Sequence, residues 1–205
     1  MRYALALCLL GLASCTALGK GQVEHLATAR VTPDFETYQL HRVGLMPLAG
    51  RELQDEQAEM LQNALFTEFS HQTPYEIVPL DPQDLEEVVQ IESYRRGRYE
   101  SQMVIDLARR FRLDGVLIGT VIDYQYYSPQ RLSLQVDLVA SETGAAIWSG
   151  SVSLDGTSER VHRAVEAYFE ASESVKTADG KGWEIALLSP RLFAQFAAWQ
   201  ISKML

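Results

Sequence analysis

Cysteine is scarce in this 205-residue sequence: there are two, Cys8 and Cys15, and both fall within the first fifteen residues. The rest of the chain therefore contains neither a disulfide framework nor a cysteine metal site. Histidine is scarce too, and its four positions share no metal-ligand spacing. We expect no metal site. The histidines are His25, His41, His71 and His162.

Signatures of common catalytic sites are also lacking. The sequence has no phosphate-binding loop and no dinucleotide-binding fingerprint. The segment 150–154, Gly-Ser-Val-Ser-Leu, is not a serine-nucleophile elbow, since it ends in leucine rather than glycine. Acids such as Asp84, Glu86 and Glu87 lie on an expected helix that needs a solvated face. We therefore predict no catalytic residue and no cofactor, with an envelope enzyme of unrecognised type as an alternative.

Positive charge is limited, with 18 Lys and Arg against 27 Asp and Glu and a formal net charge of -9. The tightest cluster of cations is Arg95, Arg96 and Arg98. A domain this acidic repels phosphate backbones, so we expect no nucleic-acid partner. The content of 47% hydrophobic and 22% charged residues is typical of a globular chain, and the length suits one domain.

The N-terminal apolar run is short. Residues 3–12 follow Arg2 and fall below the roughly 20 apolar residues of a membrane-spanning helix, so they match the core of a secretory signal peptide. The run ends in Leu12-Ala13-Ser14-Cys15, which resembles a bacterial lipobox. We predict a signal peptide over residues 1–14, cleavage between Ser14 and Cys15, and lipidation of Cys15. An ordinary cleaved signal with a chance cysteine is the alternative.

The resemblance to a lipobox implies a diacylglycerol thioether and an N-acyl chain, such as palmitate, on Cys15. Each buried methylene adds about 0.8 kcal/mol of membrane affinity, and two or more chains give stable anchoring. Thr16 stands where aspartate usually favours the inner membrane. We therefore predict a lipid-anchored protein of the cell outer membrane that faces the periplasm, with residues 15–37 forming the lipidated cysteine and a tether.

The following segment, residues 38–178, predicts one domain of the α/β (α+β) class: a mixed β-sheet of about five strands packed against helices. Pro79 makes the second strand an edge strand or marks the end of the strand. The third strand is apolar on both faces and is expected to be central. The last two alternate around a turn and predict an antiparallel hairpin. The expected strands are 40–47, 75–80, 115–122, 132–138 and 146–154, and the helices are 53–69, 81–91, 101–114 and 158–175.

Two groups of aromatic residues are candidate partner surfaces. Tyr124, Tyr126 and Tyr127 follow the central strand, where packing at the strand end is the alternative. Residues 179–205 predict a linker and a C-terminal helix that begins at Ser189-Pro190. This helix has more apolar bulk than a free tail should show, and folding back onto the domain is the alternative. Its large residues are Phe193, Phe196 and Trp199.

Three segments together resemble a known superfamily: RVGLMPLAG (42–50), LARRFRLDGVLIGTVIDY (107–124) and VDLVASETGAAIWSGSV (136–152). It contains the curli secretion lipoprotein CsgG, the N-terminal domain of TolB, the lipoprotein activators of penicillin-binding proteins and the polysaccharide-export lipoprotein PelC. The resemblance covers about residues 40–154. It implies a compact CsgG/TolB-like α/β domain without catalysis, which binds envelope proteins as an assembly, scaffold or secretion-accessory factor.

Several members of this superfamily form rings, so the resemblance also implies a homo-oligomer. A pore-forming secretion subunit of the CsgG type is an alternative. The alternating residues of the 132–154 hairpin have the pattern of a lipid-facing strand, which is the observation that keeps this alternative open.

Overall fold

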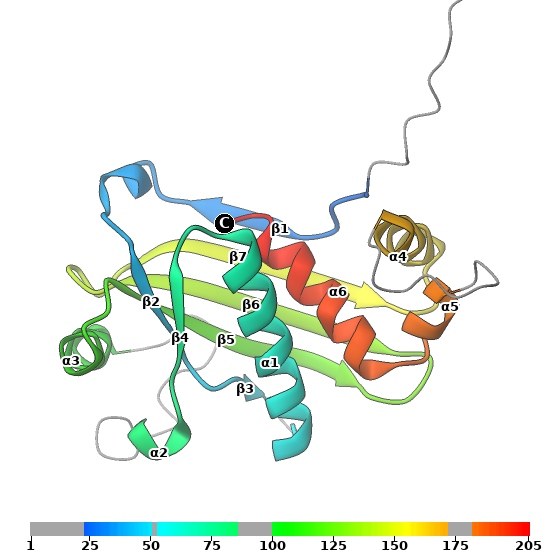
Figure 1. Ribbon diagram of the computed structural model, residues 1–205, viewed down its shortest axis with the longest axis horizontal. Coiled ribbons are helices and arrows are strands. Elements are labelled where there is room, and N and C mark those ends of the chain that lie inside the picture. Colours follow the sequence, from blue (N-terminus) through cyan, green and yellow to red (C-terminus); the bar gives the residue numbers. More distant parts are fainter. Residues whose placement is uncertain (1–22, 51–52, 86–99, 172–181) are drawn as a thin grey trace, which may run out of the picture.

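The computed structural model describes residues 23–50, 53–85, 100–171 and 182–205 (Figure 1). Its strands are β1 (Thr28–Val31), β2 (Arg42–Leu45), β3 (Ala49–Gly50), β4 (Glu76–Pro79), β5 (Gly115–Gln125), β6 (Arg131–Ala140) and β7 (Ala146–Asp155). Its helices are the 3-10 helix η1 (Phe35–Thr37), α1 (Asp55–Gln72), α2 (Pro82–Leu85), α3 (Ser101–Phe111), α4 (Glu159–Ala171), α5 (Gly182–Ala186) and α6 (Pro190–Ser202).

The strands form one mixed sheet in the order β1-β7-β6-β5-β2-β4, and β3 pairs with β5 beside this path. Strands β2, β3 and β4 join through parallel pairs, whereas β5, β6, β7 and β1 are antiparallel neighbours. The prediction of a mixed sheet against helices is confirmed, and all five expected strands are present. Strand β4 lies at the edge of the sheet and ends at Pro79, so both positions that the proline allowed are found.

The prediction of an aperiodic tether through residue 37 is wrong for its last part. Residues Thr28–Val31 pair with Ser151–Trp148 of β7, and Ala27 is buried in the core. An edge strand is held by backbone hydrogen bonds on one side, so its side chains need no apolar alternation. Strand β3 escaped prediction because two residues carry no periodic pattern.

One face of the sheet is covered by α1 and α6, which lie side by side across β5, β6 and β7 (Figure 1). Leu61, Leu65 and Phe69 of α1 belong to the same buried cluster as Leu134 and Val136 of β6. The apolar side of the predicted hairpin is buried in this cluster. The pattern that suggested a lipid-facing pore strand is therefore satisfied by helices of the same chain.

On the other face of the sheet, helix α3 covers the half that contains β5. Val104 and Leu107 of α3 pack with Val116 and Ile118 of β5 in a second buried cluster, which explains why the central strand is apolar on both sides. The α3 cluster reaches Val139 at the end of β6. Further along β6 and on β7, the described residues of this face are mainly polar, with Ser149 half-buried and Ser151 and Ser153 exposed.

The C-terminal helix is not a separate unit, which corrects the predicted division at residue 179. Helix α6 starts as expected, with the Ser189 hydroxyl accepting a hydrogen bond from the Leu192 amide at 3.5 Å and Pro190 in the first turn. It then packs against α1 and the sheet. Helix α5 lies in the segment that was predicted as a linker.

Two smaller predictions concern helix boundaries. The helix predicted over residues 101–114 is α3, which ends at Phe111; Glu100 holds its N-cap position, and the Ser101 hydroxyl donates to the Gly144 carbonyl at 2.9 Å. The helix predicted over residues 81–91 is described as far as Leu85, and Arg95, Arg96 and Arg98 lie outside the described residues.

Candidate functional site

The predicted lipidation site, Cys15, and the predicted cleavage junction with Ser14 lie outside the described residues.

The three tyrosines that were predicted as a partner surface differ in their burial. Tyr124 lies within β5, and its half-buried ring packs against the core. Burial and, second, the nearby Tyr126 raise the pKa of the Tyr124 hydroxyl to about 12. Tyr126 and Tyr127 are exposed in the loop between β5 and β6. Packing at the strand end therefore accounts for Tyr124, whereas Tyr126 and Tyr127 remain candidates for a partner surface.

The aromatic residues of α6 do not form a free partner surface. Phe193 and Phe196 are buried in the core. Trp199 is half-buried and has its ring centroid 4.8 Å from that of Tyr168. The apolar bulk of α6 is used to cover the sheet beside α1, so the alternative of a helix folded back onto the domain describes the structure.

Helix α6 also fixes the N-terminal end of the described chain through one buried amide. The Gln200 side chain is 0% exposed; its Nε2 donates to the Glu24 carbonyl at 2.9 Å and its Oε1 accepts from the Leu26 amide at 2.7 Å. The Glu24 carboxylate pairs with the Arg160 guanidinium of α4 at 2.8 Å. We call Glu24, Leu26, Arg160 and Gln200 the N-terminal clasp.

The ring of His25 stacks on that of Trp199, with centroids 5.6 Å apart and an interplanar angle of 12°. Together with the clasp, this contact makes the chain enter the fold at a fixed point between α4 and α6. Sequence reasoning missed the clasp because a single glutamine on an amphipathic helix is ordinarily a surface residue.

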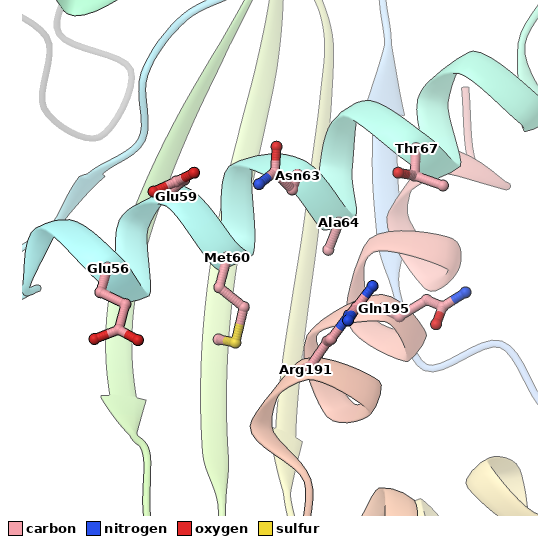
Figure 2. Close-up of a pocket in the computed structure, with 8 residues that line it drawn as sticks. All are labelled: Glu56, Glu59, Met60, Asn63, Ala64, Thr67, Arg191 and Gln195. Carbon is pink, nitrogen blue, oxygen red and sulfur yellow. The ribbon is translucent and has the colours of Figure 1, made fainter.

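A groove of about 460 Å³ lies between α1 and α6 (Figure 2). Met60 and Ala64, both half-buried, extend from α1 towards α6 and supply its apolar part. Polar and charged side chains surround them. The groove is lined by Glu56, Glu59, Met60, Asn63, Ala64 and Thr67 of α1 and by Arg191 and Gln195 of α6.

The rim of this groove has charges of both signs. Glu56 and Glu59 lie on the α1 side and Arg191 on the α6 side. In the described part of the chain, Arg191 forms no ion pair, so its guanidinium is available to an incoming group. An apolar centre inside a polar rim is the arrangement of a protein-binding patch.

Behind the groove, the Gln195 amide donates to the buried Glu68 carboxylate at 3.3 Å. Burial and, second, the charge of Glu68 raise the pKa of the Tyr168 hydroxyl above its ordinary value. The hydrogen bond between Gln195 and Glu68 joins α6 to α1 beneath the groove.

The polar sheet face on β6 and β7 is a second surface. The buried Asp137 carboxylate accepts a hydrogen bond from the Ser149 hydroxyl at 2.5 Å and two from the Gln135 amide at 3.2 Å. A hollow of about 430 Å³ lies beside them and is lined by Thr28, Ala29, Arg30, Gln135, Ser149 and Ser151. The Asp137 carboxylate is thus already hydrogen-bonded, and the hollow beside it presents the hydroxyls of Thr28 and Ser151, which contact each other at 3.1 Å, and the side chain of Arg30.

Across residues 23–50, 53–85, 100–171 and 182–205, no three His, Cys, Asp or Glu side chains are grouped so that they could hold a metal ion. None of the helices seen in these ranges has the length and apolar character needed to cross a membrane.

No family model and no curated protein sequence matches the chain. Among solved structures, the PelC dodecamer from Paraburkholderia phytofirmans has a TM-score of 0.46 at 12% identity, covering 67% of this chain and 87% of that one. Lipoprotein GNA1162 from Neisseria meningitidis has a TM-score of 0.40 at 19% identity, covering 56% and 79%. The LpoB C-terminal domain from Escherichia coli has a TM-score of 0.36 at 22% identity, covering 55% and 82%.

Proposed function

We propose that this protein is a lipoprotein of the outer membrane, facing the periplasm, which acts without catalysis by binding other envelope proteins in the α1–α6 groove. The observation that carries the proposal is the lipobox-like Leu12-Ala13-Ser14-Cys15 directly after a short apolar run. Thr16, rather than aspartate, supports the outer membrane. The absence of catalytic motifs from the sequence supports a binding role.

The clasp supports anchoring close to the bilayer. Val23, the first described residue, follows Cys15 by eight residues. At no more than about 3.6 Å per residue, this segment spans at most about 29 Å. A domain attached through so short a segment stays near the lipid surface. Its role would be to present the groove to a partner that is itself in or beside the membrane.

The α1–α6 groove supports the choice of a protein as ligand. Met60 and Ala64 offer an apolar floor the size of a few side chains, and Glu59 and Arg191 provide charges of both signs at the rim. Interfaces gain affinity from such a desolvated centre and orientation from the polar groups around it. We propose an assembly, scaffold or secretion-accessory role on this basis. Ring assembly, implied by the superfamily resemblance, stays a prediction.

The two cysteines allow a matched test of the anchor. In cells fed labelled palmitate, a Cys15→Ser variant should incorporate no label and should be released from the membrane fraction, because it lacks the thiol that forms the thioether. A Cys8→Ser variant should be labelled and fractionated as the unaltered protein, since Cys8 is discarded with the signal peptide. Equal labelling of the Cys15→Ser variant would contradict the proposal.

A further inference from the structure

One end of the sheet brings together segments that are distant in the sequence. Gln125, Arg131 and Asp155 are paired across β5, β6 and β7, so the β5–β6 loop lies at the same end as the exit of β7 into α4. Thr28 of β1 pairs with Ser151 of β7, which places the start of β1 towards this end as well. The chain therefore enters the fold at the same end of the sheet, beside β7 and α4.

Helix α5 belongs to the same end. The rings of His162 on α4 and Trp183 on α5 have centroids 6.3 Å apart, and α4 also holds Arg160 of the clasp. Figure 1 shows α4, α5 and the β5–β6 loop along one end of the sheet, on the right of the view, with α4 beside the point where the first described residues enter the fold. We call this the clasp end of the domain.

Exposed apolar side chains concentrate at the clasp end. Tyr127 is 79% exposed, Leu188 66%, Ile185 50% and Tyr126 38%. They make up four of the six large hydrophobic residues that are exposed within the described ranges. A scattered set of single residues would need no explanation, but a cluster at one end of an acidic domain indicates a contact surface.

We propose that the clasp end lies against the bilayer, with Tyr126, Tyr127, Ile185 and Leu188 inserted between lipid headgroups and the outer part of the acyl chains. This inference rests on the proposed lipidation of Cys15. The segment from Cys15 to Val23 reaches at most about 29 Å, and it starts from this same end. The anchor therefore brings these four residues, and not those of the opposite end, to the lipid surface.

The chemistry of the residues fits a lipid interface. Tyrosine has an apolar ring and a polar hydroxyl, and it is enriched where bilayers meet water. Ile185 and Leu188 are three residues apart and provide two aliphatic side chains without a charge. Of the charges at this end, the Arg131 guanidinium lies 3.8 Å from the Asp123 carboxylate, and the exposed Glu184 adds a negative charge next to Ile185. Attraction to the bilayer would thus come from apolar burial rather than from net charge.

A fluorescent label can locate this end relative to the lipid. The intact lipidated protein would be purified as a Tyr127→Cys variant, labelled at that thiol with an environment-sensitive nitrobenzoxadiazole dye, and bound to phosphatidylethanolamine–phosphatidylglycerol vesicles. Lipidated Cys15 has no free thiol and does not react. A Thr143→Cys variant, labelled in the β6–β7 turn at the opposite end of the sheet, is the control.

We expect the label at position 127 to shift its emission to the blue on vesicles and to be quenched by lipids brominated on the acyl chains. The label at position 143 should do neither. Vesicle flotation without these changes at position 127 would overturn the proposed orientation and leave the lipid anchor intact. Failure to float would contradict the anchor and the orientation together. A blue shift without vesicles that grows with protein concentration would mean that a second copy covers this end, which also overturns the proposal.

Discussion

At the scale of single residues, Gln200 decides how the N-terminal end of the domain is held. Its amide hydrogen-bonds to a carbonyl and to an amide of the chain two residues apart, at Glu24 and Leu26, much as a neighbouring strand would. These backbone groups would otherwise have to be satisfied at a partly buried surface. A buried side chain that satisfies two of them is difficult to replace.

A Gln200→Leu variant should lose about 1–3 kcal/mol of unfolding free energy, because the carbonyl of Glu24 and the amide of Leu26 lose their partner. Denaturant unfolding measures the loss, and limited proteolysis should show earlier cleavage around residues 23–27. Gln102→Leu, on the exposed side of α3, is the control and should change stability by less than about 0.5 kcal/mol. Equal stability of the two variants would mean that the clasp does not hold this segment.

At the scale of elements, β7 shows how a strand accommodates a large aromatic residue. The buried Trp148 indole donates through Nε1 to the Met204 carbonyl at 2.9 Å, beyond the end of α6, and meets Phe69 of α1 edge to face at 6.3 Å. The ring lies over Gly150, two residues further along the same face. The missing side chain at Gly150 is thus what lets the indole connect the sheet to α1 and to the C-terminus.

We expect Gly150→Ala to destabilise the fold by about 1–3 kcal/mol, because the added Cβ would overlap the six-membered ring of Trp148 and a buried indole has little room to move. The change would be measured by thermal or denaturant unfolding, with tryptophan emission reporting on the indole environment. Ser151→Ala alters the adjacent residue on the opposite, polar face and should be nearly neutral. A neutral Gly150→Ala would show that the indole can shift aside.

At the scale of the whole molecule, the two proposals use different surfaces. In the proposed orientation the clasp end faces the bilayer, which leaves the α1–α6 groove and the polar sheet face for proteins. The groove has an apolar floor at Met60 and Ala64, and the sheet face offers hydroxyl groups. This difference is the reason to expect the stronger contact at the groove.

Photo-cross-linking in cells can show whether a partner binds at the α1–α6 groove or at the polar sheet face. A benzoylphenylalanine in place of Asn63, which lines the groove and is exposed, should capture a partner. The same residue in place of Thr143 should not. A product at twice the mass of the chain would identify a second copy and support ring assembly, and another mass would identify a different envelope protein. Capture from Ser151 on the sheet face without capture from Asn63 would contradict the assignment to the groove.

The sequence by itself determined the five main strands, the central position of β5, the edge or strand-end position of Pro79 and the start of α6 at Ser189-Pro190. Each of these follows from a local pattern: apolar residues on both faces, a proline that cannot donate a hydrogen bond, or a capping hydroxyl. Such patterns report whether a face is covered. They do not say which segment covers it.

Only the tertiary structure decided the rest. Strand β1 is joined to β7 by backbone groups, so its exposed side chains gave no sign of it. Phe193 and Phe196 had the same apolar character whether α6 met a partner or its own sheet, and long-range packing against α1 selected the sheet. The groove and the clasp at Gln200 arise because residues more than fifty positions apart in the sequence meet in space, and a local sequence pattern carries no information about such contacts.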